Sequence, residues 1–149
     1  MIDGVLVTPL KNIIDERGCI SHFFKNTDSD FNKFGEIYFS HIMPGAIKAW
    51  HCHKEMDLNY CVVAGKIKLV LYDSRDGSFT RGGMMELFLG PQDHKRVHVP
   101  HGVWNGFKGI HTQTSIVANM ATIPHNVDEI VRMSPFDSSI KYDWGIKHG

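Results

Sequence analysis

Two histidines separated by one residue, His51 and His53, are the side chains of this sequence best suited to chemistry. In an extended strand, side chains two positions apart project from the same face, so both imidazoles would enter one pocket while Cys52 faces away. Imidazole exchanges a proton near neutral pH and is also a common ligand of transition metals. The pair is therefore a candidate for acid–base catalysis or metal binding, with buried, purely structural histidines as the alternative.

A metal site at this pair would need further ligands. Asp57 follows four residues after His53 and could complete a set of ligands formed by His51, His53 and Asp57. Pro100 to Asn105 resembles the second cupin motif, Pro-X-Gly-X-X-His, whose last residue would supply the next ligand; here that position is Asn105, and an amide is a poor ligand for zinc or iron beside imidazoles. The sequence therefore predicts no cofactor, and a metal bound by His51, His53 and Asp57 is the alternative.

Polar and aromatic residues near the pair could line a ligand pocket. Lys48 could supply a cation, and Asn59 and Asn105 could supply hydrogen-bonding groups. Trp50 and Tyr60 could add stacking surfaces. Convergent groups of these kinds would suit a sugar nucleotide.

The elements that position these side chains are expected to be strands. Short runs of β-branched and aromatic residues alternate with turn residues, which is typical of an all-β sandwich or barrel. A single helical turn is expected near Thr27–Phe34. The expected strands are Glu36–Met43, Ile47–His53, Leu58–Val63, Lys66–Tyr72, Met84–Leu89, Arg96–Val99, Trp104–Phe107, Thr114–Asn119 and Glu129–Arg132.

Length and composition narrow the class of protein. The 149 residues predict a single domain, residues 1–149, with a core large enough to fold unaided. Sixteen basic residues balance sixteen acidic ones, so we expect no nucleic acid as partner. No stretch approaches the roughly 18 apolar residues of a membrane helix, so we expect no membrane association. Three cysteines without CxxC spacing favour reduced thiols and a cytoplasmic location. The aromatic tail, Pro135 to Gly149, is expected to pack on the barrel or on a partner subunit.

Four segments together resemble the dTDP-4-dehydrorhamnose 3,5-epimerase family of cupins, a resemblance that runs through most of the chain. They are Asp15-Glu16-Arg17-Gly18, similar to an Asp-X-Arg-Gly segment; Pro44 to His53, similar to the glycine-led run into the catalytic histidine; Val70 to Arg75 with Ser78 and Thr80, similar to Asp-X-Arg-X-X-Ser-X-Thr; and Val99 to Phe107, similar to Pro-X-Gly-X-X-His-Gly-Phe.

The resemblance implies a cupin-type jelly-roll β-barrel, also called a double-stranded β-helix. It implies that His51 is a general base that removes a proton beside the C4 keto group of a nucleotide-linked 6-deoxysugar. Lys48 matches an arginine of the family, and Arg17 matches the residue that reaches the diphosphate, often from a neighbouring subunit. A homodimer is therefore expected. The expected substrate-binding residues are Arg17, Lys48, Asn59, Tyr72, Trp104 and Asn105.

The family's acid, a tyrosine, has no counterpart at the matching positions. That tyrosine would fall between Ile116 and Asn119, where this sequence has none. Candidates for a relocated acid are Tyr38, Tyr60, Tyr72 and His53, and nothing in the sequence chooses among them.

The resulting expectation is a nucleotide-sugar isomerase or epimerase acting on a dTDP-4-keto-6-deoxyhexose in deoxysugar or surface polysaccharide biosynthesis, with His51 and His53 as catalytic residues. The His51-X-His53 spacing also resembles dTDP-sugar 3,4-ketoisomerases, in which two histidines on one strand move a proton between adjacent carbons. A non-catalytic sugar-binding or metal-binding cupin is the remaining alternative.

Overall fold

All regular secondary structure in the computed structural model, which describes residues 1–147, consists of β-strands. The strands are β1 (Leu6–Pro9), β2 (Asn12–Asp15), β3 (Gly18–Ser21), β4 (Glu36–Ile42), β5 (Ile47–His53), β6 (Leu58–Ala64), β7 (Ile67–Asp73), β8 (Met84–Leu89), β9 (Lys95–Val99), β10 (Val103–Gly109), β11 (Ser115–Ala121) and β12 (Ile130–Arg132). Within this range there is no helix long and apolar enough to cross a membrane.

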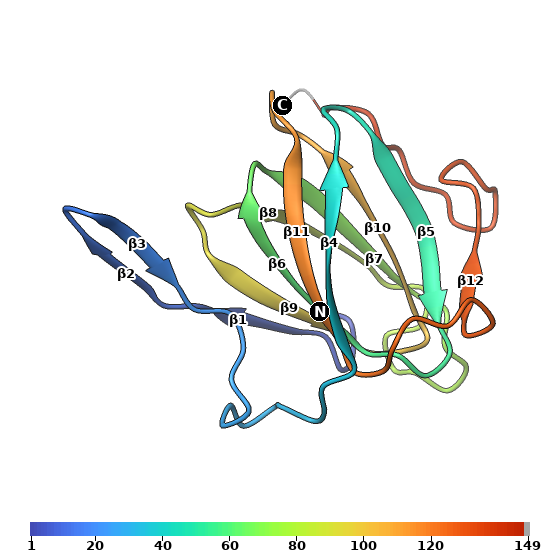
Figure 1. Ribbon diagram of the computed structural model, residues 1–149. Helices are drawn as coiled ribbons and strands as arrows, with labels where there is room; N and C mark the ends of the chain where they lie inside the picture. Colours follow the sequence, from blue (N-terminus) through green and yellow to red (C-terminus); the bar gives the residue numbers. More distant parts are fainter. Residues whose placement is uncertain (148–149) are drawn as a thin grey trace.

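Two antiparallel five-stranded sheets pack against each other (Figure 1). One has the strand order β1-β9-β6-β11-β4 and the other has the order β12-β5-β10-β7-β8. The β2–β3 hairpin forms a separate two-stranded sheet that projects from the barrel as an arm (Figure 1). This is the expected all-β jelly-roll barrel of the cupin type.

The core fills the space between the sheets with residues that alternate along the strands. Residues on the inner face include Leu69 and Leu71 of β7, Val97 and Val99 of β9, and Val117 of β11, and all are almost fully buried. Strand parity produces this pattern, because alternate side chains point to opposite faces of a sheet. The apolar core leaves the gap between β4 and β5 for polar side chains.

A second apolar cluster covers the outer face of the sheet that contains β5. Trp50 and Val70 pack there against Ile140 and Trp144 of the C-terminal segment. The Lys108 ammonium also donates a hydrogen bond to the Trp144 carbonyl at 2.7 Å. The tail therefore packs on the barrel as expected, as far as the described residues extend; His148 and Gly149 lie outside them.

The sequence located the central strands well and the N-terminal region less well. The nine expected strands are present as β4 to β12, with ends shifted by a few residues, but β1, β2 and β3 were not anticipated. The helical turn expected near Thr27–Phe34 is wrong. The chain there makes isolated turns, with Asp28 accepting a hydrogen bond from the Lys25 amide. Asp30 is drawn to Arg96 at 2.9 Å, and this tertiary ion pair replaces a helical cap.

Candidate active site

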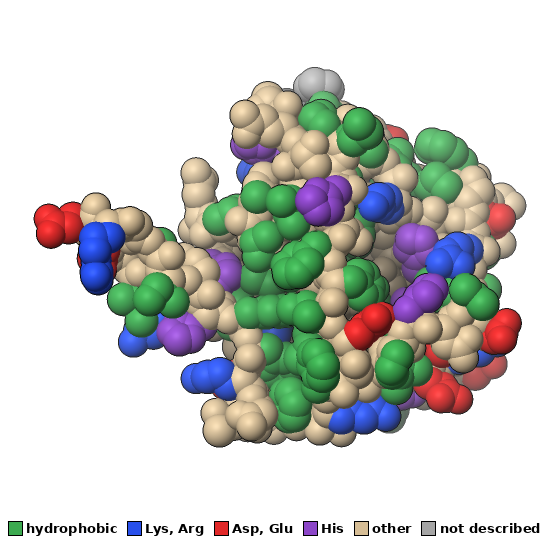
Figure 2. Space-filling model, viewed as in Figure 1, with side chains coloured by type: hydrophobic (Ala, Val, Ile, Leu, Met, Phe, Trp, Pro, Cys, Tyr) green, Lys and Arg blue, Asp and Glu red, His purple; other side chains and the backbone are tan. Residues whose placement is uncertain are grey.

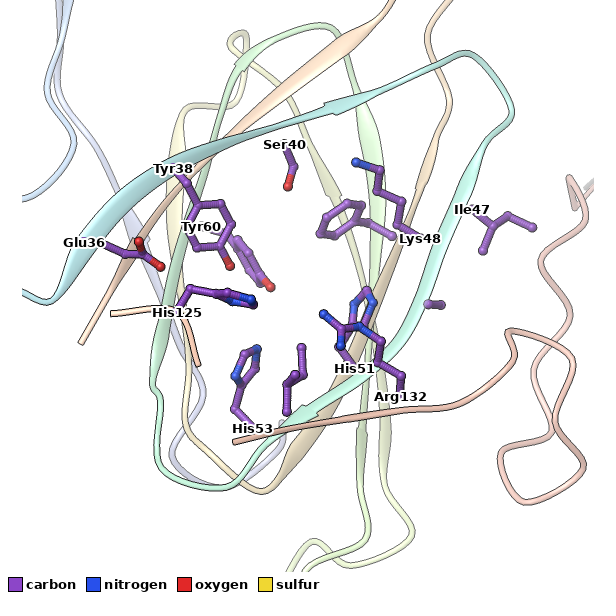
Figure 3. A pocket seen from close by; sticks show the side chains of 13 residues that line it. Glu36, Tyr38, Ser40, Ile47, Lys48, His51, His53, Tyr60, His125 and Arg132 are labelled. Carbon is purple, nitrogen blue, oxygen red and sulfur yellow. The ribbon is translucent and has the colours of Figure 1, made fainter. Parts of the chain in front are cut away.

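A cavity of about 580 Å³ opens between β4 of one sheet and β5 and β12 of the other. Figure 3 shows imidazole, phenol, ammonium and guanidinium groups directed toward its centre from both sheets. Its lining consists of Glu36, Tyr38, Ser40, Ile47, Lys48, Ala49, His51, His53, Tyr60, Phe107, His125, Ile130 and Arg132.

Strand β5 supplies three polar side chains to the cavity, Lys48, His51 and His53. His51 and His53 face the cavity together, as their spacing requires. Lys48 shares this face although it lies an odd number of positions before His51. The register with β10 explains this, because Asn105 pairs with His51 while Phe107 pairs with Lys48, so β5 carries one extra residue. Such a bulge changes the parity of a strand and turns Lys48 into the cavity.

A carboxylate fixes the imidazole of His53. The Nδ1 atom of His53 donates a hydrogen bond to Oε2 of Glu129 at 2.7 Å, and both side chains are almost fully buried. Burial by itself raises the pKa of Glu129, but hydrogen bonds from His53 and from the Met56 and Glu55 amides together lower it. With a proton on Nδ1, the Nε2 atom of neutral His53 carries the free lone pair.

Within residues 1–147, the second imidazole, that of His51, has no carboxylate partner, and it lies near the cationic side chains of Lys48 and Arg132. Burial is the main reason that the pKa of His51 falls to about 4, and the charges of Arg132, His53 and Lys48 lower it further. Arg132 is brought here because it pairs with His51 across β12 and β5. His51 is therefore a neutral imidazole at neutral pH.

The tyrosines of the cavity are each held by an asparagine. The side-chain amide of Asn119 contacts the Tyr38 hydroxyl at 2.7 Å, and that of Asn105 contacts the Tyr60 hydroxyl at 3.0 Å. Asn105 also donates to the His51 carbonyl at 3.1 Å. Of the three tyrosines considered as the acid, Tyr38 and Tyr60 line the cavity.

The expected substrate-binding residues are not all brought to this cavity. Lys48 lines it, and Asn105 is buried next to it. Asn59 instead points to the other side of its sheet, where its carbonyl oxygen accepts a hydrogen bond from His98 at 3.1 Å. Its neighbour Tyr60 takes the inward position, because adjacent residues of a strand face opposite ways.

Tyr72 and Trp104 lie on the outer face of their sheet, where both pack against the Trp50–Trp144 cluster. They pair with each other across β7 and β10, so they share that face, and the inward positions belong to their neighbours Leu71 and Asn105. The structure therefore places neither ring in the cavity. Arg17 is at the tip of the β2–β3 arm, where it forms an exposed ion pair with Asp15.

The alternative metal set does not come together. Asp57 accepts hydrogen bonds from the amide and the imidazole of His101, at 2.9 and 2.8 Å, and lies outside the cavity lining. No group of three His, Cys, Asp or Glu side chains within residues 1–147 is arranged to hold a metal ion. The structure therefore does not bring the alternative ligand set His51, His53 and Asp57 together, since the chain turns after His53 and carries Asp57 away.

Sequence reasoning missed Glu36, His125, Glu129 and Arg132 as parts of the site. The sequence contained a signal for two of them. Glu129 and Arg132 are the first and last residues of a short expected strand, which therefore has a charged residue at each end. Only the pairing of β12 with β5, in register Ile130 to His53 and Arg132 to His51, shows that this strand borders the histidines.

Comparison with known proteins identifies the family of this site. A sequence model described as dTDP-4-dehydrorhamnose 3,5-epimerase matches residues 1–148. The chain belongs to this family. Membership makes it an isomerase or epimerase of nucleotide-sugar or polysaccharide biosynthesis. This supports an enzyme over the alternative of a non-catalytic cupin.

Individual proteins that resemble the chain point in the same direction. The spore coat polysaccharide biosynthesis protein SpsL of Bacillus subtilis is 29% identical over 146 residues, which cover 97% of each chain. The crystal structure of a dTDP sugar isomerase from Desulfovibrio desulfuricans is 34% identical, with a TM-score of 0.93 over 96% of this chain and 92% of the other. RmlC from Legionella pneumophila, solved with dTDP-4-keto-L-rhamnose, shares the fold at 21% identity, with a TM-score of 0.88 over 99% and 81% of the two chains.

Proposed function

We propose that the enzyme removes a proton beside the C4 keto group of a nucleotide-linked 4-keto-6-deoxyhexose, with His51 and His53 as its catalytic imidazoles. The observation that carries this proposal is the His53–Glu129 pair in an open cavity. A keto group acidifies the adjacent carbon, so a well-oriented imidazole is strong enough to form the enolate. No metal is needed for this step.

The two imidazoles have different roles in this proposal. The Glu129 carboxylate is placed to stabilise the imidazolium that forms when Nε2 of His53 accepts the proton, so His53 takes the role of the base. His51 stays neutral, since its pKa is about 4, and a neutral imidazole can donate a hydrogen bond to the enolate oxygen. His51 is thereby the hydrogen-bond donor to the enolate oxygen, although the family resemblance alone favours it as the base.

The cavity has groups suited to a charged sugar. Lys48 and Arg132 face it and would attract the diphosphate or the enolate oxygen. The Oε1 atom of Glu36 is buried and has no hydrogen-bond partner within residues 1–147, so it could accept a hydrogen bond from a sugar hydroxyl. The dTDP-sugar bound to the Legionella relative supports a nucleotide sugar as ligand.

Deuterium exchange tests this proposal directly. In deuterated water, the enzyme is expected to incorporate deuterium at C3 or C5 of dTDP-4-keto-6-deoxyglucose, detected by mass spectrometry and NMR. His53→Ala is expected to reduce the rate about 10²-fold or more, as is typical when a general base is lost. Wild-type protein that exchanges no deuterium into any dTDP-4-keto-6-deoxyhexose would refute the proposal.

We further propose that the enzyme is a homodimer in which Arg17 serves the partner's site. The outer face of the β4-containing sheet exposes Ile37, Phe39 and Val63, and Figure 2 shows a large apolar area there. An apolar area of this kind favours burial against a second copy. The β2–β3 arm projects from the barrel (Figure 1), and Arg17 lies in the turn at its tip, which suits a contact in trans.

Light scattering and mixing of variants test the dimer. A mass of two chains is expected for the wild type, and Phe39→Asp is expected to give monomers. Mixing Arg17→Ala with His53→Ala is expected to restore part of the exchange activity, because one mixed site keeps both residues. A monomeric wild type would exclude the contribution in trans.

We also place the enzyme in the cytoplasm. Cys19, Cys52 and Cys61 are all free thiols, which suits a reducing compartment. Fractionation of the producing cells tests this, and recovery outside the cytoplasmic fraction would contradict it.

A further inference from the structure

The two tyrosines of the cavity differ in the direction of their hydrogen bonds. Tyr38 comes from β4 and Tyr60 from β6, and both hydroxyl groups are held by asparagine side chains of β11 and β10. The orientation of an asparagine amide decides whether a hydroxyl group donates or accepts. Here each amide is oriented by a backbone group whose character is unambiguous.

Asn119 presents its NH₂ group to Tyr38. The Oδ1 atom of Asn119 accepts a hydrogen bond from the backbone amide of Asn59 at 2.9 Å, and an N–H group can only donate. The Nδ2 atom must therefore face Tyr38, and it donates to the hydroxyl oxygen at 2.7 Å. The Tyr38 hydroxyl is an acceptor in this contact, and its own proton remains available to the cavity.

Asn105 presents the opposite end of its amide to Tyr60. Its Nδ2 atom donates to the backbone carbonyl of His51 at 3.1 Å, and a carbonyl can only accept. Oδ1 therefore faces Tyr60, whose hydroxyl must donate to it at 3.0 Å. The proton of Tyr60 is thus engaged, and the residue is almost fully buried.

We propose that Tyr38 is the general acid of the reaction and that Asn119 is the residue that positions it. This assignment rests on the proposed function above. It identifies one tyrosine among the candidates, since Tyr38 alone combines a place in the cavity lining with a hydroxyl proton that no group within residues 1–147 accepts.

The placement of Tyr38 fits inversion at carbon. Tyr38 enters from one sheet, while His51 and His53 enter from the other, and Figure 3 shows the phenol and the imidazoles on different sides of the open space. Epimerisation removes a proton from one face of a carbon and returns one to the other face. Migration of a keto group between neighbouring carbons can use a single face, so a cross-cavity acid favours epimerisation over 3,4-ketoisomerisation.

The proton balance closes with water alone. The base takes the proton from carbon, and the C–H electron pair becomes the enolate double bond. Tyr38 then gives its proton to the opposite face of that carbon while the C4 carbonyl re-forms. The phenolate left behind accepts the hydrogen bond of Asn119, regains a proton from water, and the imidazolium returns its proton to water.

Tyr38 also keeps its proton until the enolate forms. Burial raises the pKa of Tyr38, the hydrogen bond from Asn119 lowers it, and the nearby charges of Glu36 and Glu129 raise it again, so that it stays above the ordinary value of 10.0. The residue is therefore an acid, and not a second base, at neutral pH.

The test separates proton removal from inversion by measuring two products in deuterated water. Tyr38→Phe is expected to keep deuterium exchange into the unepimerised sugar within about tenfold of wild type, because the imidazoles are intact. It is expected to lower the epimerised product about 10²-fold or more. Tyr60→Phe is the matched control and is expected to keep the wild-type ratio of epimerised to exchanged sugar.

Asn119→Asp provides a second, independent variant. One carboxylate oxygen can still accept from the Asn59 amide, while the other replaces the NH₂ donor and accepts the Tyr38 proton. The ratio of epimerised to exchanged sugar is expected to fall as in Tyr38→Phe. It is expected to recover in part below the pKa of the new carboxyl group, a pH response that a purely structural role would not produce.

The outcomes distinguish the two proposals. A wild-type enzyme without any exchange refutes the proposed function itself. A wild-type enzyme that epimerises, together with a Tyr38→Phe variant that keeps the wild-type ratio, refutes the role of Tyr38 alone. If the ratio of epimerised to exchanged sugar fell in Tyr60→Phe but not in Tyr38→Phe, Tyr60 would be the general acid.

Discussion

Nδ1 of His53 donates to Oε2 of Glu129 over 2.7 Å, although 76 positions separate the two residues in the chain. The other carboxylate oxygen accepts hydrogen bonds from the amides of Glu55 and Met56, at 3.1 and 2.9 Å. Glu129 is therefore fixed on both sides, and it determines which nitrogen of His53 carries the proton.

Glu129→Gln is expected to reduce deuterium exchange about 10²-fold or more. The glutamine oxygen can still accept from the Glu55 and Met56 amides, so its NH₂ group would face His53 and donate to Nδ1. The proton of the imidazole would then sit on Nε2, which could no longer act as a base. Mass spectrometry of the exchanged sugar measures this.

The exposed Glu55 in the adjacent turn gives a matched control, and Glu55→Gln is expected to leave the exchange rate unchanged. If Glu129→Gln exchanged deuterium at the wild-type rate, His53 would not be the base.

Acid should destabilise the protein partly through His51. Its pKa is 6.5 in an ordinary environment and about 4 in the folded protein, so the unfolded chain binds a proton more readily. The free energy of unfolding is therefore expected to fall as the pH decreases from about 6.5 to about 4. Urea titrations of the wild type and of His51→Asn across this range measure it, and the variant should show the shallower decline. Equal slopes would contradict a neutral, buried His51.

The buried carboxylate of Asp73 holds several side chains of the following loop by hydrogen bonds. Asp73→Asn is expected to lower the free energy of unfolding by about 3 kcal/mol. Asp73 is fully buried and accepts hydrogen bonds from Arg75, Ser78 and Thr80, of which those from the Arg75 side chain contribute most to lowering its pKa. Chemical denaturation measures the loss. Asp76→Asn removes an exposed ion pair with Arg81 and is expected to change little. An equally small loss of unfolding free energy in Asp73→Asn would show that the hydrogen bonds of this carboxylate are not important for stability.

The C-terminal segment should contribute to stability through one aromatic ring. Trp144 is 3% exposed and packs on Trp50, with ring centroids 5.2 Å apart, so Trp144→Ala is expected to cost about 3–5 kcal/mol. Phe136 in the same segment is 76% exposed, and Phe136→Ala is expected to have no measurable effect on thermal unfolding. Equal effects of the two substitutions would mean that Trp144 does not anchor the C-terminal segment to the barrel.

Much of the barrel was predictable because strand signals are local. In Lys66-Ile67-Lys68-Leu69, polar and apolar residues alternate, and β7 begins at Ile67 within this stretch. The arm was not predictable in this way. Its strands β2 and β3 have mostly exposed side chains, so they lack the hydrophobic alternation that marks a strand packed on a core.

The candidate site was predictable only where parity within one strand decides it. His51 and His53 share a face for that reason, and both line the cavity. Tyr72 and Trp104 were expected at the substrate, yet parity turns them outward, because the inward positions of β7 and β10 at that level belong to Leu71 and Asn105. The face that a strand turns inward depends on the pairing of strands distant in the sequence.

The sequence by itself determined the class of fold, the family and the pair of histidines, since these depend on local alternation and on motifs read along the chain. The tertiary structure alone decided the partners of those histidines. Glu129 reaches His53, and Asn119 reaches Tyr38, through pairings between strands far apart in the chain. Hydrogen-bond direction depends on atoms brought together by folding, and this is why the structure could distinguish an available tyrosine proton from an engaged one.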